Sequence, residues 1–385
     1  MTRPDGRLLP PAGYYRTVEE WFSACQSNGN PTEGNKLDLF SEHDSQFSTP
    51  KGLDEAFTPR EYHQRLHHSA FVAVIPGGRL WGPRGAVITP DNKLLWDVSL
   101  EFWGSSPEQH SVFQQAGLPP VEHCSETLGV LTYTASDSYF HWMLDVLPRI
   151  ALLRKTGIAI DKFVFNTNYN PPPSFHTETL DMLGIPPGAR LTIGTVNVHL
   201  QAKLLVSSLV GYHSNYPRWA VDFLRDAFSK YSGAGDANEY KRLYISREDA
   251  NYRKITNEDQ VMDLLGKYRF QKVVLSKLSV EQQIRIFSSA EIIIAPHGAN
   301  LTNLVFCKRG TKVIEIFSPY YINTIYWIMS NHAGLDYYYF IGNKMQPSKS
   351  LFEYNKVREV SRAAQGIEVD IDRLRSMMKR TGMDI

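Results

Sequence analysis

The sequence has few cysteines, no long apolar run and no excess of charge of one sign, and each absence excludes a class of protein. Its three cysteines, Cys25, Cys124 and Cys307, lie far apart, so neither a disulfide framework nor a zinc site is indicated. No stretch approaches the ~18 apolar residues of a membrane-spanning helix, and no apolar signal core opens the sequence. We therefore expect a cytoplasmic protein without a transmembrane segment, for which peripheral membrane association stays open.

The charge balance gives no reason to expect a nucleic-acid partner. Lysine and arginine number 41 against 40 acidic residues, a formal net charge of +1, whereas nucleic-acid-binding domains carry a basic excess. Hydrophobic residues make up 42% and charged residues 21%, which is ordinary for a globular protein. A chain of 385 residues is long enough for two domains with substantial cores.

The first part of the chain reads as an extension followed by an α/β domain. Residues 1–65 are mixed and loop-rich, and residues 66–232 form the predicted N-terminal domain. Short β segments with a hairpin turn at Pro90–Lys93 come first. Strands then alternate with helices, including a long helix over residues 138–157 and another that Pro217 opens.

The second part alternates strand and helix throughout, which predicts a parallel, doubly wound sheet. A small polar stretch, residues 232–240, reads as a linker, the predicted second domain spans residues 238–345, and residues 346–385 form a tail with a final helix. Two capping boxes, Thr256 with Asp259 and Ser279 with Gln282, are expected to open helices.

Within this second domain, the corner "PHGAN" follows the buried strand "EIIIA". A turn between a parallel strand and the next helix faces the ligand crevice of a doubly wound sheet, where free N–H groups and the helix dipole suit an anion. His297, Gly298, Ala299 and Asn300 are therefore candidate binding residues. The alternative is an ordinary turn next to a core histidine.

Three further polar features belong to the same predicted sheet edge. Arg247 ends a strand and Arg253 follows in the loop, where each can hold a phosphate or form a surface salt bridge. Glu315 lies inside the apolar strand "KVIEIF", and a buried carboxylate needs a partner. A ribose diol or a neighbouring basic side chain would supply it. The pair Thr302 and Asn303, in the first turn after the corner, can cap N–H groups or face a ligand.

In the first domain, His141, Asp145 and Arg149 are spaced by four residues and share one face of the predicted helix. A histidine–aspartate pair on an apolar helix suits general-base chemistry, because the carboxylate fixes the imidazole tautomer or itself takes a proton. We favour His141 as the base, with Asp145 orienting it and Arg149 keeping Asp145 ionised. A purely structural ion pair is the alternative.

The ordered stretches "YFHWMLDVLPR", "YISRED" and "APHGANLTNLVFCKRGTKVIEIFSP" together resemble glycosyltransferase family 61, the capsular-polysaccharide-biosynthesis-like glycosyltransferases. The resemblance covers residues 128–340. It implies a GT-B-like α/β fold, with two Rossmann-like domains facing across a cleft and the donor nucleotide in the second. Ala295 and Asn300 replace glycines of the family's usual corner, and Asn tolerates unusual backbone angles. Asp137 and Ser138 stand where the family usually has Gly-Asn.

The predicted function is that of an inverting glycosyltransferase, which moves a sugar from a nucleotide sugar to a hydroxyl of a glycan acceptor in cell-surface or capsular polysaccharide synthesis. We expect no metal and no cofactor besides the sugar donor, since the one Asp-x-Asp stretch, Asp370–Asp372, suits helix capping. A hydrolase lacks its Gly-x-Ser-x-Gly elbow here, and a dehydrogenase its glycine fingerprint. A non-catalytic module that binds nucleotide sugars or polysaccharide is the alternative.

Overall fold

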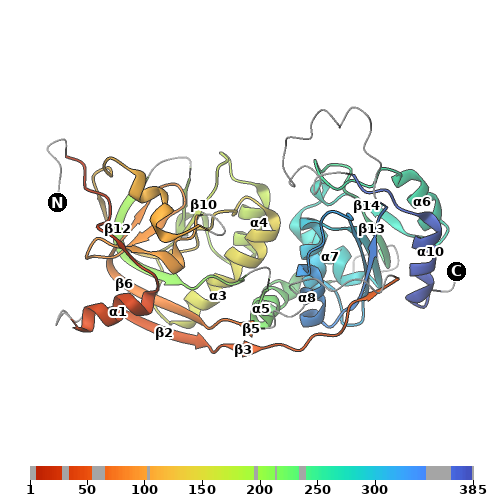
Figure 1. Cartoon of the computed structure of the whole chain (residues 1–385), viewed down its shortest axis with the longest axis horizontal. Coiled ribbons are helices and arrows are strands. Elements are labelled where there is room, and N and C mark those ends of the chain that lie inside the picture. Colours follow the sequence, from red (N-terminus) through yellow and green to blue (C-terminus); the bar gives the residue numbers. More distant parts are fainter. Residues whose placement is uncertain are drawn as a thin grey trace. The chain divides into compact units, whose positions relative to one another are not determined.

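The computed structural model divides the chain into two compact units, an N-terminal unit and a C-terminal unit, drawn in Figure 1. The described parts of the N-terminal unit are residues 6–27, 34–44, 66–101, 105–194 and 198–212. Those of the C-terminal unit are residues 45–53, 215–233, 240–343 and 366–383.

This division differs from the expected domain boundaries in two places. The second unit begins at residue 213, so helix α5 (Arg218–Phe228) belongs to it rather than to the first domain. Residues 45–53, expected to be part of an N-terminal extension, join the C-terminal sheet, because β4 (Lys51–Gly52) pairs with β17 (Asp336–Ile341). Most of the predicted linker, residues 234–239, and tail residues 346–365 lie outside the described residues.

The N-terminal unit is built on a nine-stranded mixed sheet with the order β1-β8-β7-β6-β12-β9-β10-β11, and β2 also pairs with β6. A short two-stranded ribbon, β3 with β5, completes the described strands of this unit. The strands are β1 (Tyr14–Tyr15), β2 (Asn35–Phe40), β3 (His43–Asp44), β5 (Leu66–His67), β6 (Ala70–Trp81), β7 (Ala86–Ile88), β8 (Leu94–Leu95), β9 (Glu122–Val130), β10 (Lys162–Asn166), β11 (Arg190–Ile193) and β12 (His199–Ser207).

Only half of this sheet has the parallel pairing of a Rossmann-like domain. β12, β9, β10 and β11 run parallel, whereas β6 pairs antiparallel with β2, β7 and β12. Short turns connect β6 to β7 and β7 to β8, whereas long segments of the chain separate β6 from its other antiparallel partners, β2 and β12. The predicted hairpin turn is present, and Asn92 takes a left-handed φ of 64° in it.

The long helix expected over residues 138–157 is present but interrupted. It consists of α2 (Tyr139–His141), the π-helical turn η5 (Trp142–Val146) and α3 (Leu147–Lys155). Pro148 has no N–H to donate back along the helix, which favours the wider turn at this point. The other helices of the unit are α1 (Val18–Ser27) and α4 (Ser174–Met182).

The C-terminal unit contains a six-stranded sheet with the order β14-β13-β15-β16-β17-β4, and every pairing is parallel, as predicted. Its main strands and helices, besides β4, β17 and α5, are β13 (Arg242–Ile245), β14 (Gln271–Val273), β15 (Ile292–Pro296), β16 (Lys312–Phe317), α6 (Glu258–Gly266), α7 (Val280–Ser289), the 3-10 helix η9 (Ala299–Phe306), α8 (Ile325–Ala333) and α10 (Ile371–Arg380).

The strand order places a topological switch point between β13 and β15. The chain runs from β13 outward to β14 and then returns to the other side of β13 with β15. In open parallel sheets, ligands bind outside the carboxyl ends of the strands at such a point. The loops that follow β13 and β15 therefore form the expected ligand edge of this unit.

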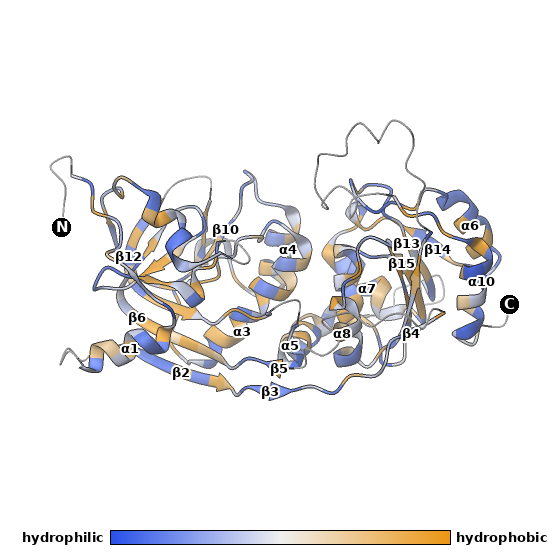
Figure 2. Ribbon diagram, viewed as in Figure 1, coloured by the Kyte–Doolittle hydropathy of each residue, from blue (hydrophilic) through white to orange (hydrophobic). Residues whose placement is uncertain are grey.

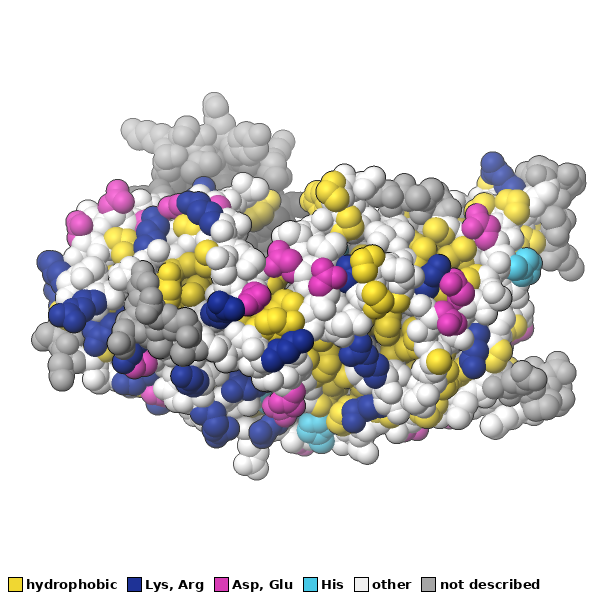
Figure 3. All heavy atoms as spheres, turned by 180° about the vertical axis from the view of Figure 1, so that it is seen from behind, with side chains coloured by type: hydrophobic (Ala, Val, Ile, Leu, Met, Phe, Trp, Pro, Cys, Tyr) yellow, Lys and Arg dark blue, Asp and Glu magenta, His cyan; other side chains and the backbone are white. Residues whose placement is uncertain are grey.

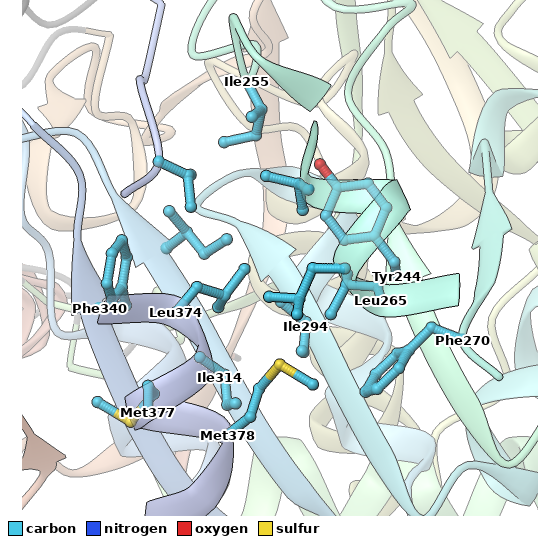
Figure 4. Packing of buried hydrophobic residues seen from close by; sticks show 14 of the residues in the cluster. Tyr244, Ile255, Leu265, Phe270, Ile294, Ile314, Phe340, Leu374, Met377 and Met378 are labelled. Carbon is cyan, nitrogen blue, oxygen red and sulfur yellow. The ribbon is translucent and has the colours of Figure 1, made fainter. Parts of the chain in front are cut away.

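The sheet is buried on both faces, which explains its apolar strands. All five residues of β15 are buried, and the strands are mostly hydrophobic in Figure 2. On one face, α10 lays Leu374, Met377 and Met378 against Ile314 and other strand side chains (Figure 4). On the opposite face, the side chain of Glu315 lies near Tyr326 of α8.

Local predictions at helix starts were partly correct. Ser279 and Gln282 form the expected capping box, and Asp370 caps α10. The box expected at Thr256 is wrong, because α6 begins at Glu258 and the Thr256 hydroxyl donates to the Ile367 carbonyl instead. The segment after the "PHGAN" corner is a 3-10 helix that begins at Ala299.

Candidate functional site

The loops after β13 and β15 bring Arg247 and Gly298 into contact at the switch point. Arg247 is 8% exposed, and its guanidinium donates from Nε and Nη2 to the Tyr252 carbonyl at 3.3 and 3.2 Å. A Cβ added at Gly298 would lie 1.8 Å from Nη1 of Arg247. The close approach of this guanidinium therefore explains the glycine. The backbone of Gly298 is extended, so a left-handed φ is not the reason.

Arg253 adds a second positive charge to the same place. It is half-buried, has a left-handed φ of 54°, and donates from Nε to the His297 carbonyl at 3.2 Å. Its guanidinium also lies 4.8 Å from the centre of the Tyr321 ring. A non-glycine residue in this region of φ is uncommon and costs energy, and here it turns Arg253 back toward the corner.

The two arginines have no carboxylate partner within the described part of the chain. Burial, and then the nearby charge of Arg253, lowers the pKa of Arg247. Two partly buried cations beside one another repel, and an anion between them would relieve that cost. Planar guanidinium groups suit phosphate oxygens in particular.

His297 directly follows β15, and three aromatic rings surround its imidazole. The rings of Phe317, Tyr321 and Tyr326 have their centres 5.2 to 5.4 Å from the imidazole. Nδ1 is hydrogen-bonded to Glu315 Oε1. Nε2 has no hydrogen-bond partner among the described residues, and it is not one of their fully buried unpaired atoms. It is therefore the edge of the ring that a ligand can reach.

Glu315 has different partners from the ribose hydroxyls that we expected. Its side chain is fully buried, one oxygen contacts His297, and the other accepts from the Tyr337 hydroxyl at 2.5 Å. Neither a lysine nor an arginine pairs with it in the described residues. A carboxylate enclosed in this way presents no oxygen to a bound sugar and instead holds the imidazole.

The remaining candidate binding residues at this edge of the sheet differ in their solvent exposure. Ala299 and Asn300 are half-buried at the start of η9, within reach of a ligand. Thr302 and Asn303 are fully buried. The Asn303 amide donates to Gln283 at 2.9 Å, and Thr302 lies beside the Tyr326 hydroxyl. These two side chains fix η9 on its neighbours rather than face the crevice.

The N-terminal unit holds the second pair of interest. His141 Nδ1 is 2.7 Å from Asp145 Oδ2, with the imidazole 26% exposed and the carboxylate 1% exposed. With Nδ1 as the donor to Asp145, Nε2 is left as a proton acceptor. The pair spans η5, and such π-helical turns occur frequently at functional sites.

Arg149 is built into the sheet rather than paired directly with Asp145. It is fully buried and donates to the carbonyls of Thr132 and Val130 and to the Ser207 hydroxyl, at 2.8 to 2.9 Å. Burial lowers its pKa to about 10, and the charge of Asp145 opposes that shift. Arg149 thus joins the carboxyl ends of β9 and β12 to α3 and supplies positive charge beneath Asp145.

Aromatic groups support the His141 pair from both sides. The Tyr133 ring lies 5.6 Å from the imidazole, and burial together with the Asp145 charge raises the pKa of its hydroxyl. On the other side of the helix, Trp142 stacks on His176 with ring centres 3.7 Å apart. Burial lowers the pKa of His176 to about 4, so this imidazole is neutral.

Two residues of the C-terminal edge were not predicted from the sequence. Tyr337 was missed, although the alternation in "DYYYF" would have placed every second tyrosine on the face of Glu315, had the register of β16 and β17 been known. Tyr252 was also missed. Its ring is 56% exposed in the loop between Arg247 and Arg253, and its carbonyl accepts from the Arg247 guanidinium.

Beyond these two places, the described residues line a pocket among Arg225, Ser288, Phe306 and Lys308, which contains none of the predicted site residues. They contain no group of three or more histidine, cysteine or acidic residues with the geometry of a metal site. No described helix is long and apolar enough to cross a membrane. On the face drawn in Figure 3, basic and acidic side chains are interspersed rather than gathered by sign.

Comparisons with known proteins agree with the motifs. Residues 139–314 match the family model described as Glycosyltransferase 61. The beta-1,2-xylosyltransferase RCN11 of Oryza sativa subsp. japonica is 29% identical over 136 residues, 31% of this chain and 25% of its own length. The protein O-linked-mannose beta-1,4-N-acetylglucosaminyltransferase 2 of Bos taurus is 27% identical over 158 residues, 39% of this chain and 26% of its own length.

The matched relatives are thus covered over only about a quarter of their length. The matched region contains both His141 and His297 and ends one residue before Glu315. The resemblance inferred from the ordered motifs is confirmed by the family model, which matches residues 139–314.

Proposed function

We propose that this protein is an inverting glycosyltransferase, which transfers a sugar from a nucleotide-sugar donor to a hydroxyl of a glycan acceptor. The observation that supports the proposal most is a pair of guanidinium groups that have no acidic partner among the described residues. They lie at the switch point of a parallel sheet, inside the region matched by the family. Nucleotide-sugar diphosphates are anions of the kind that such a place binds.

In this proposal the C-terminal unit binds the sugar donor. Arg247 and Arg253 hold the diphosphate, with the half-buried Ala299–Asn300 corner beside it. As the bond from the anomeric carbon to the diphosphate breaks, the bonding electrons pass to the diphosphate oxygen. Fixed cations at that oxygen stabilise the charge that develops there. A GT-B-like arrangement of the two units is part of the same proposal.

The N-terminal unit supplies the base. His141 Nε2 takes the proton of the acceptor hydroxyl as its oxygen attacks the anomeric carbon from the side opposite the diphosphate, which inverts that carbon. Asp145 keeps Nδ1 as the donor, so that Nε2 is unprotonated and ready. Arg149, buried beneath, favours the ionised form of Asp145. A module that only binds nucleotide sugars would have no use for this pair.

Several finer features of the proposal rest on the family resemblance and on composition. They are independence of a metal ion, a cytoplasmic location, and participation in cell-surface or capsular polysaccharide synthesis. The relatives named above carry xylosyl- and N-acetylglucosaminyltransferase names, so both pentoses and N-acetylhexosamines are candidates for the sugar.

A screen of nucleotide sugars against glycan acceptors tests the proposal. Product formation is followed by mass spectrometry, in the presence and absence of EDTA, with the configuration of the new linkage determined by NMR. We expect transfer from at least one sugar donor, unaffected by EDTA, with inverted configuration. Retained configuration contradicts the mechanism, and tight nucleotide-sugar binding without any transfer favours the binding module.

A further inference from the structure

Three side chains form one hydrogen-bonded row in the C-terminal sheet: His297, directly after β15, Glu315 of β16 and Tyr337 of β17. In the parallel register, Ala295 of β15 pairs with Glu315 of β16, which pairs with Tyr339 of β17. Because side chains alternate between the faces of a sheet, His297, Glu315 and Tyr337 all lie on the same face. Their side chains then meet across the strands rather than along one of them.

Two hydrogen bonds link the row, one between Tyr337 and Glu315 and one between Glu315 and His297. The Tyr337 hydroxyl donates to Oε2 of Glu315 at 2.5 Å, and Oε1 of the same carboxylate is hydrogen-bonded to His297 Nδ1. Burial and the charge of Glu315 raise the pKa of Tyr337 well above its ordinary value, so the hydroxyl stays protonated and keeps donating. Both carboxylate oxygens are therefore committed, and the imidazole ring cannot rotate without losing its bond.

Among the described residues, Glu315 is the acidic side chain paired with His297. Tyr321 from the loop after β16 and Tyr326 from α8 present aromatic rings, and Phe317 stacks on the imidazole. Arg253 reaches the His297 carbonyl, and Arg247 lies against the next residue, Gly298. Nε2 is the ring nitrogen that has no hydrogen-bond partner among the described residues and is not one of their fully buried unpaired atoms.

We propose that Tyr337 and Glu315 are positioning residues, which hold His297 so that a protonated Nε2 donates a hydrogen bond to the diphosphate of the sugar donor. The inference rests on the proposed function and extends it beyond the two arginines. For Nε2 to donate, the His297–Glu315 pair must hold one proton more than when only Nδ1 of the imidazole is protonated. A bound diphosphate, being negative, favours the uptake of that proton.

During transfer, no bond is made or broken at His297. The bond from the anomeric carbon to the diphosphate oxygen breaks, the electron pair stays on that oxygen, and the Nε2–H hydrogen bond strengthens as the charge grows. The proton of the acceptor hydroxyl leaves on the separate base proposed above. The hydrogen bond from His297 therefore stabilises both the bound sugar donor and the departing diphosphate.

The test uses calorimetry of the full chain with P1,P2-dimethyl pyrophosphate, a diester whose charge is fixed near neutral pH, so that any proton uptake belongs to the protein. Titrations from pH 5.5 to 8.5 in two buffers of different ionisation enthalpy give the affinity, its pH midpoint and the protons taken up. We expect affinity to fall above the midpoint and proton uptake to accompany binding.

The variants should move this midpoint in opposite directions. Glu315→Gln removes the negative charge beside the imidazole, so the midpoint falls by about one pH unit, whereas Tyr337→Phe makes the carboxylate a stronger base and raises it by about half a unit. His297→Gln abolishes proton uptake. Tyr338→Phe, whose hydroxyl bonds Asp336 at 2.9 Å, is the matched control and leaves the midpoint unchanged.

Equal midpoints in Tyr337→Phe and Tyr338→Phe overturn the inference, and this comparison decides it even if Glu315→Gln does not fold. Wild-type binding with no proton uptake also overturns it while leaving the arginine site intact. A wild-type protein that binds neither this diester nor any nucleoside diphosphate contradicts the inference and the proposed function together.

Discussion

The two units each contain one histidine hydrogen-bonded to a buried carboxylate, but the two pairs are held and exposed differently. His141 and Asp145 lie four residues apart on one helical segment, and the imidazole is 26% exposed. His297 and Glu315 come from neighbouring strands, and the imidazole is only 6% exposed. An open ring on an apolar helix suits proton exchange with a substrate hydroxyl, whereas an enclosed ring beside two arginines suits an anion.

The two pairs also differ in where the neighbouring arginine charges lie. Arg149 carries the positive charge of the first pair, but it is buried behind the carboxylate and bonded to strand carbonyls. The positive charges near the second pair, on Arg247 and Arg253, lie against Gly298 and the His297 carbonyl. In the proposed function, the position of the arginines, more than the dyad itself, separates the general base from the phosphate site.

The largest expected effect separates the pairs by turnover. His141→Ala removes the proposed base and lowers transfer by about 10²–10⁴-fold, with nucleoside diphosphate affinity unchanged. Single-turnover assays and calorimetry on the same preparations measure both quantities. Asp145→Asn is expected to lower transfer less, because the imidazole itself remains.

Two outcomes would contradict this assignment. If Asp145→Asn abolishes transfer while His141→Ala retains most of it, Asp145 is the base. If both variants transfer at the wild-type rate, the helix is structural and the base lies elsewhere.

The second effect concerns the support of the first pair. Arg149→Ala leaves three buried acceptors without a donor and Asp145 without its neighbouring cation, so we expect the free energy of unfolding to fall by about 3–5 kcal/mol. Urea denaturation followed by tryptophan fluorescence measures it. Arg154→Ala, at an exposed position of the same helix, is the control and should cost below about 1 kcal/mol. Equal losses would show that Arg149 is not the anchor described here.

The third effect concerns the close contact between Gly298 and Arg247, next to the His297–Glu315 pair. In Gly298→Ala, the new Cβ would overlap the Arg247 guanidinium, so the arginine must move and nucleoside diphosphate affinity should fall by about 10–100-fold. Gly266→Ala has open space around its Cβ and serves as the matched control in the same unit. Unchanged affinity in Gly298→Ala would mean that Arg247 does not bind the ligand in this position.

The smallest effect depends on pH and involves the histidine packed behind the first pair. The pKa of His176 falls from 6.5 to about 4 in the fold because of burial. Stability is therefore fully present above pH 6.5 and decreases as pH falls toward 4, by up to about 3 kcal/mol. Melting temperatures between pH 4 and 7.5 should show this decrease in the wild type and a smaller one in His176→Gln. Parallel profiles would exclude His176 as the source.

The sequence predicted much of the C-terminal unit because its determinants are local. The run "EIIIA" is apolar on both faces, and each helix of the alternating series follows a turn, so the parallel sheet and its ligand edge could be inferred. The His141–Asp145 contact also depends only on helical spacing, and the structure contains it even though a π turn replaces the regular α-helix.

What could not be predicted depends on long-range register. The Tyr337–Glu315 bond requires knowing how β16 and β17 align, and the joining of Lys51–Gly52 to β17 links residues far apart in the chain. The antiparallel half of the N-terminal sheet depends on which strands pair, not on their individual patterns. Thr256 has the sequence of a helix cap, yet its hydroxyl is taken by the distant Ile367 carbonyl.

The central claim is that the switch point between β13 and β15 binds the diphosphate of a nucleotide sugar. Calorimetric titration of UDP, GDP, CDP and ADP into the wild type and into an Arg247→Ala/Arg253→Ala double variant tests it most directly. Arg285→Ala, an exposed arginine of α7 paired with Glu281, is the control. We predict that at least one nucleoside diphosphate binds the wild type and the control alike, and that the double variant binds it at least about 10-fold more weakly. Failure of all four to bind, or equal affinity in the double variant, would contradict the claim.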